Sequence, residues 1–237
     1  MNLTNKGTLY LIPNLLGGED IQIVPPYVLS LINQIRIYIV ENERNARRYL
    51  IKLGIQTAID DLTFHVLDKH DKNAGTEGFL KSALQGQNIG LISEAGSPAV
   101  ADPGALVVAA AHRQNISVQP LVGPSSILLA LMASGMNGQQ FTFHGYLPID
   151  RQERIQKIKW LDKLVQKEGY TQIFIETPYR NNKLLEQLVK NCQTHTKLCV
   201  AVDLTLPTQQ IVSKSIGKWK GKSIDLHKRP ALFLLGR

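Results

Sequence analysis

The strongest indication of the fold class is Ile89-Gly-Leu-Ile-Ser-Glu-Ala-Gly-Ser-Pro-Ala-Val-Ala-Asp-Pro-Gly104. An apolar, strand-like run leads into a loop with two Gly/Pro pairs, and a helical pattern begins at Gly104. Gly96 allows a ligand to approach the backbone closely, while the loop prolines stiffen it and leave carbonyls free to accept hydrogen bonds. The loop therefore suits a ligand with amino and hydroxyl groups, although Asp102 followed by proline is an equally good start signal for the helix alone.

Short strand-like runs alternate with helical patterns on both sides of this loop. Strands are predicted at 8–12, 35–40, 89–93 and 118–122, and helices at 26–32, 45–53, 78–85, 104–114 and 125–134. This alternation is typical of a mostly parallel sheet, which binds ligands at the carboxyl ends of its strands. A second loop, Val122-Gly-Pro-Ser-Ser126, again joins a strand to a helix, and its serines either cap that helix or hold a ligand.

The pattern restarts after Gly135-Met-Asn-Gly138, a cluster of residues that favours a break between domains. We predict two α/β domains: residues 1–137, with a mostly parallel sheet and flanking helices, and residues 138–237, a smaller domain with a mixed sheet. Its strands are predicted at 141–144, 172–175, 198–202, 210–213 and 231–235, with one helix at 182–191. Another helix carries apolar residues at helical spacing from Ile155 to Val165, and its polar face is predicted to be basic, with Arg151, Arg154, Lys157, Lys163 and Lys167.

Charge is distributed unevenly along the chain, whose net charge is +8. Residues 1–140 contain ten Lys and Arg against eleven Asp and Glu, whereas residues 141–237 contain seventeen against eight. A surplus confined to one domain indicates a surface that faces an anion such as a phosphate backbone. A solvated lysine surface is the alternative interpretation.

Several classes of protein do not fit this sequence. The apolar runs are far shorter than the roughly 20 residues that cross a bilayer, and the amino terminus lacks the features of a signal peptide, so we expect a cytoplasmic protein without a membrane segment. Cys192 and Cys199 lack the set of close Cys and His companions that a zinc site requires, and the six histidines lack ligand spacing, so no metal site is expected and both thiols are expected to be reduced. Walker, dinucleotide and nucleophile-elbow motifs are absent.

Seven ordered motifs resemble a known family. They are Gly7-Thr-Leu-Tyr10, Glu41-Asn-Glu-Arg44, Ser93-Glu-Ala-Gly-Ser-Pro98 with Asp102-Pro-Gly104, Gly123-Pro-Ser125, Ala133-Ser-Gly135, Gly145-Tyr-Leu-Pro148 and Glu176-Thr-Pro-Tyr-Arg180. Their order resembles bacterial small-subunit ribosomal RNA 2′-O-ribose methyltransferases, members of the tetrapyrrole methylase superfamily. The resemblance covers nearly the whole chain.

The resemblance implies a homodimeric methyltransferase that binds S-adenosylmethionine (SAM) in a cleft between its domains and acts on RNA of the small ribosomal subunit. Cofactor contacts are then expected from Pro13, Gly96, Ser97, Pro98, Val100, Ser125, Ser126, Tyr146, Pro207, Pro230 and Ala231. Arg44 and Arg180 are the expected phosphate contacts, because a guanidinium matches phosphate oxygens. The RNA backbone would lie on basic residues of the second domain: Lys214, Lys218, Lys220, Lys222, Lys228 and Arg229.

A ribose hydroxyl must lose its proton during methyl transfer, so a general base is expected. Its candidates are Glu41, Glu43, Glu94 and Glu176, of which Glu41 and Glu176 are the predicted catalytic residues. The alternative is that these carboxylates form ion pairs with Arg44, Arg47 or Arg180.

The polar motifs depart from the family more than the cofactor loops do. The family's Thr-Pro-Ile-Gly-Asn is here Ile12-Pro-Asn-Leu-Leu-Gly17, its Glu-Asp-Thr-Arg is Glu41-Asn-Glu-Arg44, its Ser-Asp-Ala-Gly-Thr-Pro is Ser93-Glu-Ala-Gly-Ser-Pro98, and its Glu-Leu-Thr-Lys is Asp203-Leu-Thr-Leu206. Two alternatives to an RNA methyltransferase follow: a SAM-dependent tetrapyrrole methylase, whose acidic substrate would also suit a basic domain, and a SAM-binding protein without catalysis.

Overall fold

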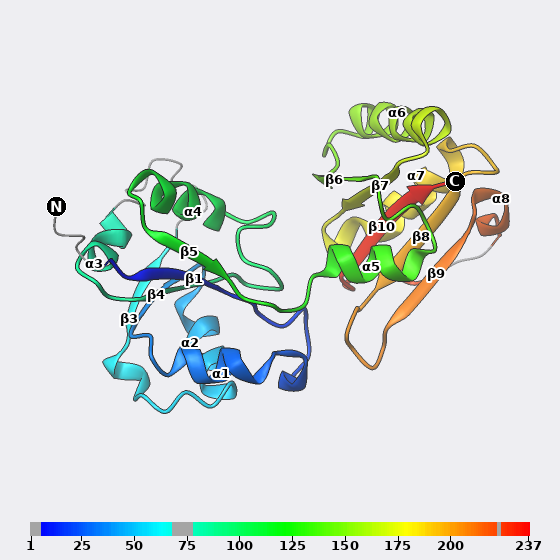
Figure 1. The fold of residues 1–237 in the computed structure, drawn as a ribbon. Coiled ribbons are helices and arrows are strands. Elements are labelled where there is room, and N and C mark those ends of the chain that lie inside the picture. Colours follow the sequence, from blue (N-terminus) through cyan, green and yellow to red (C-terminus); the bar gives the residue numbers. More distant parts are fainter. Residues whose placement is uncertain (1–5, 68–77, 222–223) are drawn as a thin grey trace. The chain divides into compact units, whose positions relative to one another are not determined.

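The computed structural model describes residues 6–67, 78–221 and 224–237. The chain divides after Ser125 into two compact units, each with its own sheet (Figure 1). The predicted α/β class, with a parallel sheet followed by a mixed one, is confirmed.

The first unit contains a parallel sheet of five strands in the order β3-β2-β4-β1-β5. Their bounds are β1 (Thr8–Ile12), β2 (Ile37–Val40), β3 (Thr63–Val66), β4 (Ile89–Ile92) and β5 (Ser117–Pro120). In register, Ile12 is paired with Ile92, and Ile92 with Val40, so the carboxyl ends of three neighbouring strands meet at one edge. Loops that follow these strands are thereby placed side by side.

Helices cover both faces of this sheet. On one face lie α1 (Pro26–Ile32) and α2 (Glu43–Lys52), which bury Ile32, Leu50 and Tyr38 in a common core. The other face is covered by α3 (Lys81–Leu84) and α4 (Gly104–Arg113), whose Ala83 and Val107 pack on Leu91. Both layers are visible in Figure 1. The inner strands β2 and β4 are buried at every residue because each side of the sheet faces a helix layer.

The second unit is built on a mixed sheet in the order β6-β7-β10-β8-β9. Its strands are β6 (Phe141–Tyr146), β7 (Thr171–Ile175), β8 (Lys197–Val202), β9 (Gln210–Ser215) and β10 (Ala231–Gly236). Strand β6 runs parallel to β7, and the other neighbouring pairs are antiparallel. The ends of β6, β7 and β8 and the start of β10 therefore lie at one edge.

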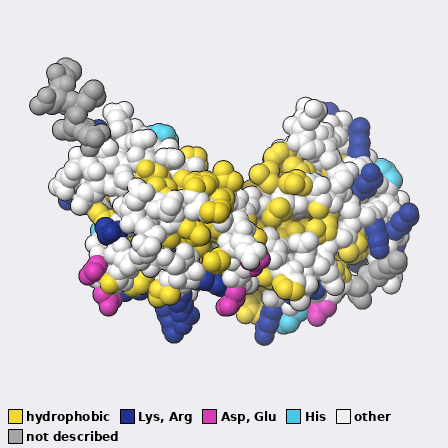
Figure 2. Space-filling model, turned by 60° about the horizontal axis from the view of Figure 1, so that its bottom comes forward, with side chains coloured by type: hydrophobic (Ala, Val, Ile, Leu, Met, Phe, Trp, Pro, Cys, Tyr) yellow, Lys and Arg dark blue, Asp and Glu magenta, His cyan; other side chains and the backbone are white. Residues whose placement is uncertain are grey.

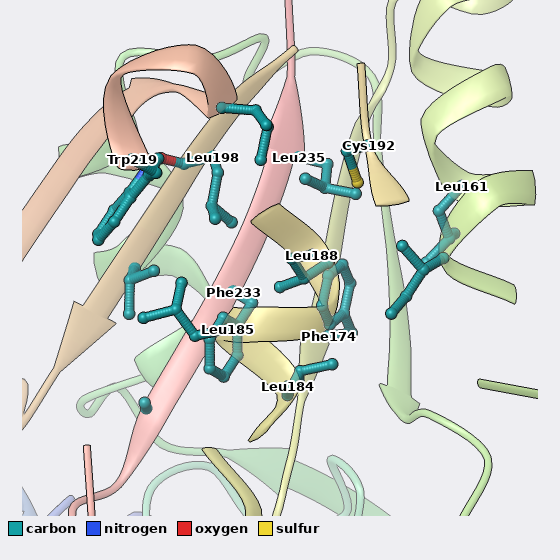
Figure 3. Close-up of a cluster of buried hydrophobic side chains, with 14 of the residues drawn as sticks. Leu161, Phe174, Leu184, Leu185, Leu188, Cys192, Leu198, Trp219, Phe233 and Leu235 are labelled. Carbon is teal, nitrogen blue, oxygen red and sulfur yellow. The ribbon is translucent and has the colours of Figure 1, made fainter. Parts of the chain in front are cut away.

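One continuous core joins this sheet to α6 (Arg151–Glu168), α7 (Asn181–Asn191) and α8 (Ile216–Trp219). Figure 3 shows Phe174 and Phe233 from the strands between leucines of α7, with Leu161 of α6 and Trp219 of α8 at its sides. The opposite helix, α5 (Ser126–Ser134), lies against β8, β9 and β10.

The boundary found between the units differs from the one predicted after residue 137. The carbonyl of Ser134 accepts a hydrogen bond from Ser213 Oγ (2.7 Å), and α5 packs on β8, β9 and β10 of the second sheet. This helix therefore belongs to the second unit. The Gly/Asn cluster at 135–138 is a turn inside that unit. Residues 126–140 contain no charged side chain, so the predicted concentration of positive charge in the second part is unaffected.

The prediction that α6 has a basic polar face is wrong for Arg154. This residue is only 4% exposed, and its guanidinium donates to Gln187 Oε1 (2.7 Å) and to the carbonyls of Pro148 and Ile149. It lies between α6 and its neighbours and is not available to a phosphate. Lys157 lies over the Trp160 ring at 3.7 Å, and burial lowers the pKa of its ammonium group.

Candidate functional site

The candidate site of the first unit lies at the carboxyl edge of its sheet, where the loops after β1, β2, β4 and β5 meet. The loop after β4, residues 93–103, is bound to the loop after β1 by paired backbone hydrogen bonds: Asn14 N donates to Gly96 O (2.8 Å), and Gly96 N donates to Asn14 O (3.2 Å). The Asn14 side chain also donates from Nδ2 to Ser93 O (2.8 Å) and Glu94 O (3.2 Å). Asn14 thus holds residues 93–96, the first part of this loop, through both its backbone and its side chain.

The second half of the loop has an unusual backbone. Ala99 (φ 66°) and Ala101 (φ 61°) are both left-handed, a conformation that costs about 1 kcal/mol or more for a residue with a Cβ. Asp102 holds this conformation: its Oδ2 accepts from Ala99 N (2.9 Å), and its Oδ1 from Gly104 N (2.7 Å). The carboxylate therefore closes the loop as well as preceding α4, and Val100 at its tip stays about half exposed.

The loops after β1 and β5 touch without space for a side chain. A Cβ on Gly123 would lie 2.1 Å from Pro13 Cβ, so only glycine fits there. Pro13 is itself held by Tyr49 of α2, whose hydroxyl donates to the Pro13 carbonyl (2.5 Å). Burial raises the pKa of Tyr49, so the hydroxyl remains a donor. The loop after β4 also binds the loop after β5, because Ser97 Oγ donates to Pro124 O (3.4 Å).

Carboxylates gather beside these loops. Glu41 follows β2, and its Oε1 accepts from the backbone N of Glu94 (3.1 Å). Glu94 Oε2 accepts from Asn45 Nδ2 (2.7 Å) at the start of α2. Glu43, by contrast, forms an ion pair with Arg47 (2.8 Å), as the alternative interpretation of the sequence expected.

The corresponding edge of the second unit is dominated by an ion pair between Glu176 and Arg180. The Glu176 side chain is fully buried, and its Oε1 accepts from Thr177 N (2.7 Å), Arg180 Nε (3.0 Å) and Arg180 Nη2 (2.7 Å). Its Oε2 is buried and has no hydrogen-bond partner in the described part of the chain. The ion-pair alternative is thus confirmed for Glu176 as well.

A second carboxylate at this edge organises the loop between β8 and β9. Asp203 Oδ2 accepts from Arg229 Nε (2.8 Å) and Thr208 Oγ1 (2.8 Å), and Asp203 and Thr205 are left-handed (φ 50° and 71°). Arg229 is therefore bound to protein and does not belong to a free basic surface. Lys222, predicted as part of that surface, lies outside the described residues.

The structure brings together most of the predicted residues of each unit. At the edge of the first sheet it places Glu41, Arg44, Pro13, Gly96, Ser97, Pro98, Val100 and Ser125. At the edge of the second it places Tyr146, Glu176, Arg180, Pro207, Pro230 and Ala231, while Ser126 begins α5. Cofactor contacts by the residues of both units stay predictions.

Sequence reasoning missed the residues that hold the site together. Asn14 lies in a segment that stands out only as a departure from the family, and Tyr49 belongs to a predicted helix. Asn14 had one local signal in the sequence: it is a polar residue directly after an apolar strand and a proline. Tyr49 gave none, because its partner, the Pro13 carbonyl, is 36 residues away.

Two classes of site have no support in the structure. No three His, Cys, Asp or Glu side chains of residues 6–67, 78–221 and 224–237 gather closely enough to hold a metal ion. Over the same ranges, each helix is too short or too polar to cross a membrane.

Comparisons with known proteins agree with these features. The sequence profile of the tetrapyrrole (corrin/porphyrin) methylases matches residues 25–219. Ribosomal RNA small subunit methyltransferase I of Synechocystis sp. is 30% identical over 215 residues, which cover 91% of this chain and 71% of that protein. The proteins of the same name are 29% identical in Xylella fastidiosa, over 86% of this chain and 70% of that protein, and 28% identical in Pasteurella multocida, over 99% and 80%.

The fold has a counterpart among solved structures. The crystal structure of the methyltransferase CobJ superposes with a TM-score of 0.65 at 18% identity, covering 98% of this chain and 94% of that one. At this identity the similarity concerns the fold alone.

Proposed function

Because the chain belongs to the tetrapyrrole (corrin/porphyrin) methylase family, we propose that it transfers a methyl group from SAM to a ribose 2′-hydroxyl of small-subunit ribosomal RNA. The chain is a methyltransferase. The observation that carries the choice of acceptor is that its similarity to ribosomal RNA small subunit methyltransferase I extends along nearly its entire length. The basic second unit supports the same acceptor, since it has the charge that a phosphate backbone requires.

The residues at the edge of the first sheet fit SAM. Gly96 is left-handed at φ 67°, and a Cβ there would lie 2.9 Å from Leu16 Cδ2, so the position favours glycine. Val100 and Val122 expose apolar side chains beside backbone of fixed conformation, a combination that suits a ligand with an apolar ring and several amino and hydroxyl groups. When bound, SAM supplies a methyl carbon made electrophilic by its sulfonium.

In this proposal the cofactor contacts of the first unit are Pro13, Gly96, Ser97, Pro98, Val100 and Ser125. The chain's own contribution is to hold these loops in one geometry, through Asn14, Tyr49 and Asp102. Alignment of reactants is a large part of catalysis when the donor is already activated. We therefore expect cofactor affinity to depend on these three side chains although none needs to touch the cofactor.

For proton removal from the acceptor hydroxyl, the proposal assigns Glu41 as the general base. Glu41 lies at the carboxyl edge of the sheet, and its Oε1 is oriented by the Glu94 amide (3.1 Å). Glu176 has a different role in the proposal. Its fully buried carboxylate holds the guanidinium of Arg180, which is about one-third exposed and would contact a phosphate, so Glu176 is a positioning residue.

The test is methyl transfer from tritium-labelled SAM to small ribosomal subunits, to naked ribosomal RNA and to a mixture of tetrapyrrole precursors. The intact protein is compared with Ser97→Trp, which fills the cofactor loop, and with Ser117→Trp, which puts the same bulk on an exposed residue at the amino end of β5. We expect label in RNA ribose for the intact protein and the Ser117 variant, and at least about a tenfold loss of SAM affinity for the Ser97 variant.

Each other outcome has a definite meaning. Label in the tetrapyrroles alone would overturn the RNA acceptor and leave the cofactor site standing. Binding of SAM without transfer to any acceptor would contradict the assignment as an active enzyme. Equal SAM affinity of the two tryptophan variants would overturn the cofactor loop.

A further inference from the structure

A polar pocket of about 560 Å³ lies in the first unit, next to the proposed cofactor loop. Its lining includes Asn14, Glu19, Asn45, Arg48, Lys52 and Glu94. Its volume is within the range of about 300–1,000 Å³ that is usual for small-ligand sites. Glu94 belongs to both features, and Asn14 lines the pocket and binds the loop, so a molecule in the pocket would be adjacent to the loop at residues 93–103.

A row of cations runs along α2 beside the pocket. Arg44, Arg48 and Lys52 are spaced four residues apart and therefore share one side of the helix; Arg48 and Lys52 line the pocket, and Arg44 continues the row beyond it. Arg44 and Arg48 are exposed and make no ion pair with any residue that the structure describes. Arg47 points elsewhere, to Glu43 and Asp60. Figure 2 is turned so that the lower part of Figure 1, with α1 and α2, comes forward, and basic side chains project from the lower border of this unit.

Lys52 is only weakly neutralised. Its Nζ lies 3.7 Å from Glu19 Oε1, and the Glu19 side chain is 92% exposed. Exposed pairs at such a distance contribute little and exchange readily with solvent or another anion. The row from residue 44 to residue 52 is about 12 Å long, at 1.5 Å per residue, so it extends beyond a single anionic group.

The pocket lining also includes a carboxylate. Glu94, an exposed residue, accepts a hydrogen bond at Oε2 from Asn45 Nδ2 (2.7 Å), and Asn14 and Tyr49 line the pocket as well. A carboxylate repels an anion but accepts hydrogen bonds from hydroxyl and amino groups. The expected ligand is therefore anionic beside Arg48 and Lys52 and neutral, with hydroxyl or amino donors, beside Glu94.

We propose that this pocket binds one ribonucleotide of the RNA substrate, with its sugar and base toward Glu94 and its flanking phosphates on Arg48, Lys52 and Arg44. The inference rests on the proposed RNA acceptor and names the part of the first unit that contacts it. An acidic tetrapyrrole fits less well, because its several carboxylates would face Glu94 and Glu19. RNA contacts thus extend to the unit whose net charge is close to zero.

The test compares Arg48→Gln and Lys52→Gln with Lys81→Gln, a matched loss of one exposed cation on α3, which precedes the amino end of β4. Fluorescence anisotropy measures affinity for a labelled single-stranded RNA over a series of salt concentrations. Calorimetry measures SAM affinity, and methyl transfer gives KM for RNA and kcat separately.

We expect Arg48→Gln and Lys52→Gln each to weaken RNA binding and raise KM for RNA about tenfold. The slope of log affinity against log salt should fall by about 0.7 for each phosphate of single-stranded RNA that the variant no longer neutralises. Affinity for SAM should stay within about twofold, because neither residue holds the cofactor loop. The Lys81 variant should match the unaltered chain in all readouts.

Failure of this inference can be told apart from failure of the proposed function. RNA affinity and salt slope unchanged in both pocket variants would overturn the pocket, even if the unaltered chain methylates RNA. If the unaltered chain methylates no RNA, the proposed function fails, and loss of RNA binding confined to the two pocket variants would still support the pocket. If the two pocket variants lost methyl transfer to the tetrapyrrole precursors while RNA binding stayed intact, the ribonucleotide would be overturned as occupant and the pocket assigned to the other class of substrate.

Discussion

At the scale of single residues, the site depends on side chains that hydrogen-bond to the backbone of its loops and fix their conformation. Asn14 binds the loop after β4 through three hydrogen-bonding groups, and Tyr49 holds the Pro13 carbonyl from a helix. A buried carbonyl that loses its donor costs about 1–3 kcal/mol. Loop conformation, and with it ligand affinity, is therefore coupled to residues below the loop surface.

Gly123→Ala tests the contact between the loops after β1 and β5. The added Cβ would lie 2.1 Å from Pro13 Cβ, so one loop must move. Overpacking of this kind costs about 1–3 kcal/mol, and we expect SAM affinity to fall at least tenfold because Pro13 is displaced. Urea unfolding and calorimetry measure the two effects.

Gly138→Ala is the matched control, because nothing lies within 4 Å of a Cβ at that position. Its stability should change by no more than about 0.5 kcal/mol, with SAM affinity unaltered. If Gly123→Ala bound SAM like the control, the loop after β5 would have no part in the cofactor site.

The sequence was informative about which loops matter and less so about which carboxylates do. Loop 93–103 was predicted from its glycine and prolines, local features that act through the backbone itself. The roles of Glu43 and Glu176 depend on arginines four residues away, and spacing alone does not decide whether such a pair forms or the carboxylate turns to a ligand. Glu94 depends on Asn45, which is 49 residues distant.

At the scale of elements, α6 illustrates how an amphipathic sequence pattern can assign one cation to the polar face of a helix when its side chain is buried. Arg154 lies on the buried side of the helix, in line with Ile158 and Leu161, where its guanidinium donates to Gln187 and to two carbonyls of the segment before the helix. The helix itself begins where Asp150 accepts from the N–H groups of Gln152 and Glu153, and ends at left-handed Gly169.

Arg154→Ala should therefore change stability. It removes the donor from three buried or partly buried acceptors, and we expect unfolding free energy to fall by about 2–4 kcal/mol. Arg151→Ala, at an exposed residue of the same helix, should change it by no more than about 0.5 kcal/mol. Both are measured by urea unfolding with tryptophan fluorescence. Similar losses in the two variants would place Arg154 on the exposed face after all.

Among the strands and α-helices of the described residues, β3 and α8 were not predicted, for related reasons. Strand β3 has four residues, none of them buried, so it lacks the apolar run that marks the inner strands; its pairing with β2 creates it. Helix α8 has four residues and is defined by Trp219, whose Nε1 donates to Leu198 O (3.0 Å). Both elements form because of tertiary contacts, which the periodicity of the sequence does not reveal.

At the scale of the whole molecule, the two units have separate cores. The core of the second unit draws on its own sheet and helices only. Both tryptophans of the chain, Trp160 and Trp219, belong to this unit, so tryptophan fluorescence reports on it alone. The two cysteines are also buried here, and burial raises the pKa of the Cys199 thiol to about 11, which keeps it protonated and unreactive near neutral pH.

Residues 126–237 expressed alone should therefore fold. We expect one cooperative urea transition by tryptophan fluorescence and by circular dichroism, with coinciding midpoints. A fragment that starts at residue 138 is the control: it lacks α5 and would leave one face of β8–β10 uncovered, so it should be less stable or aggregate. Equal stability of the two fragments would contradict the assignment of α5 to the second unit.

The order of the strands also bears on how this protein avoids aggregation. Three of the four outer strands are poorly suited to pair with another chain: β5 ends at Pro120, which has no N–H to donate, β6 has an irregular register before Tyr146, and β9 carries Lys214. Proline, irregularity and charge at an outer strand oppose intermolecular β-pairing. Substitutions that make these outer strands more regular should be avoided in any engineered version, because they would lower solubility.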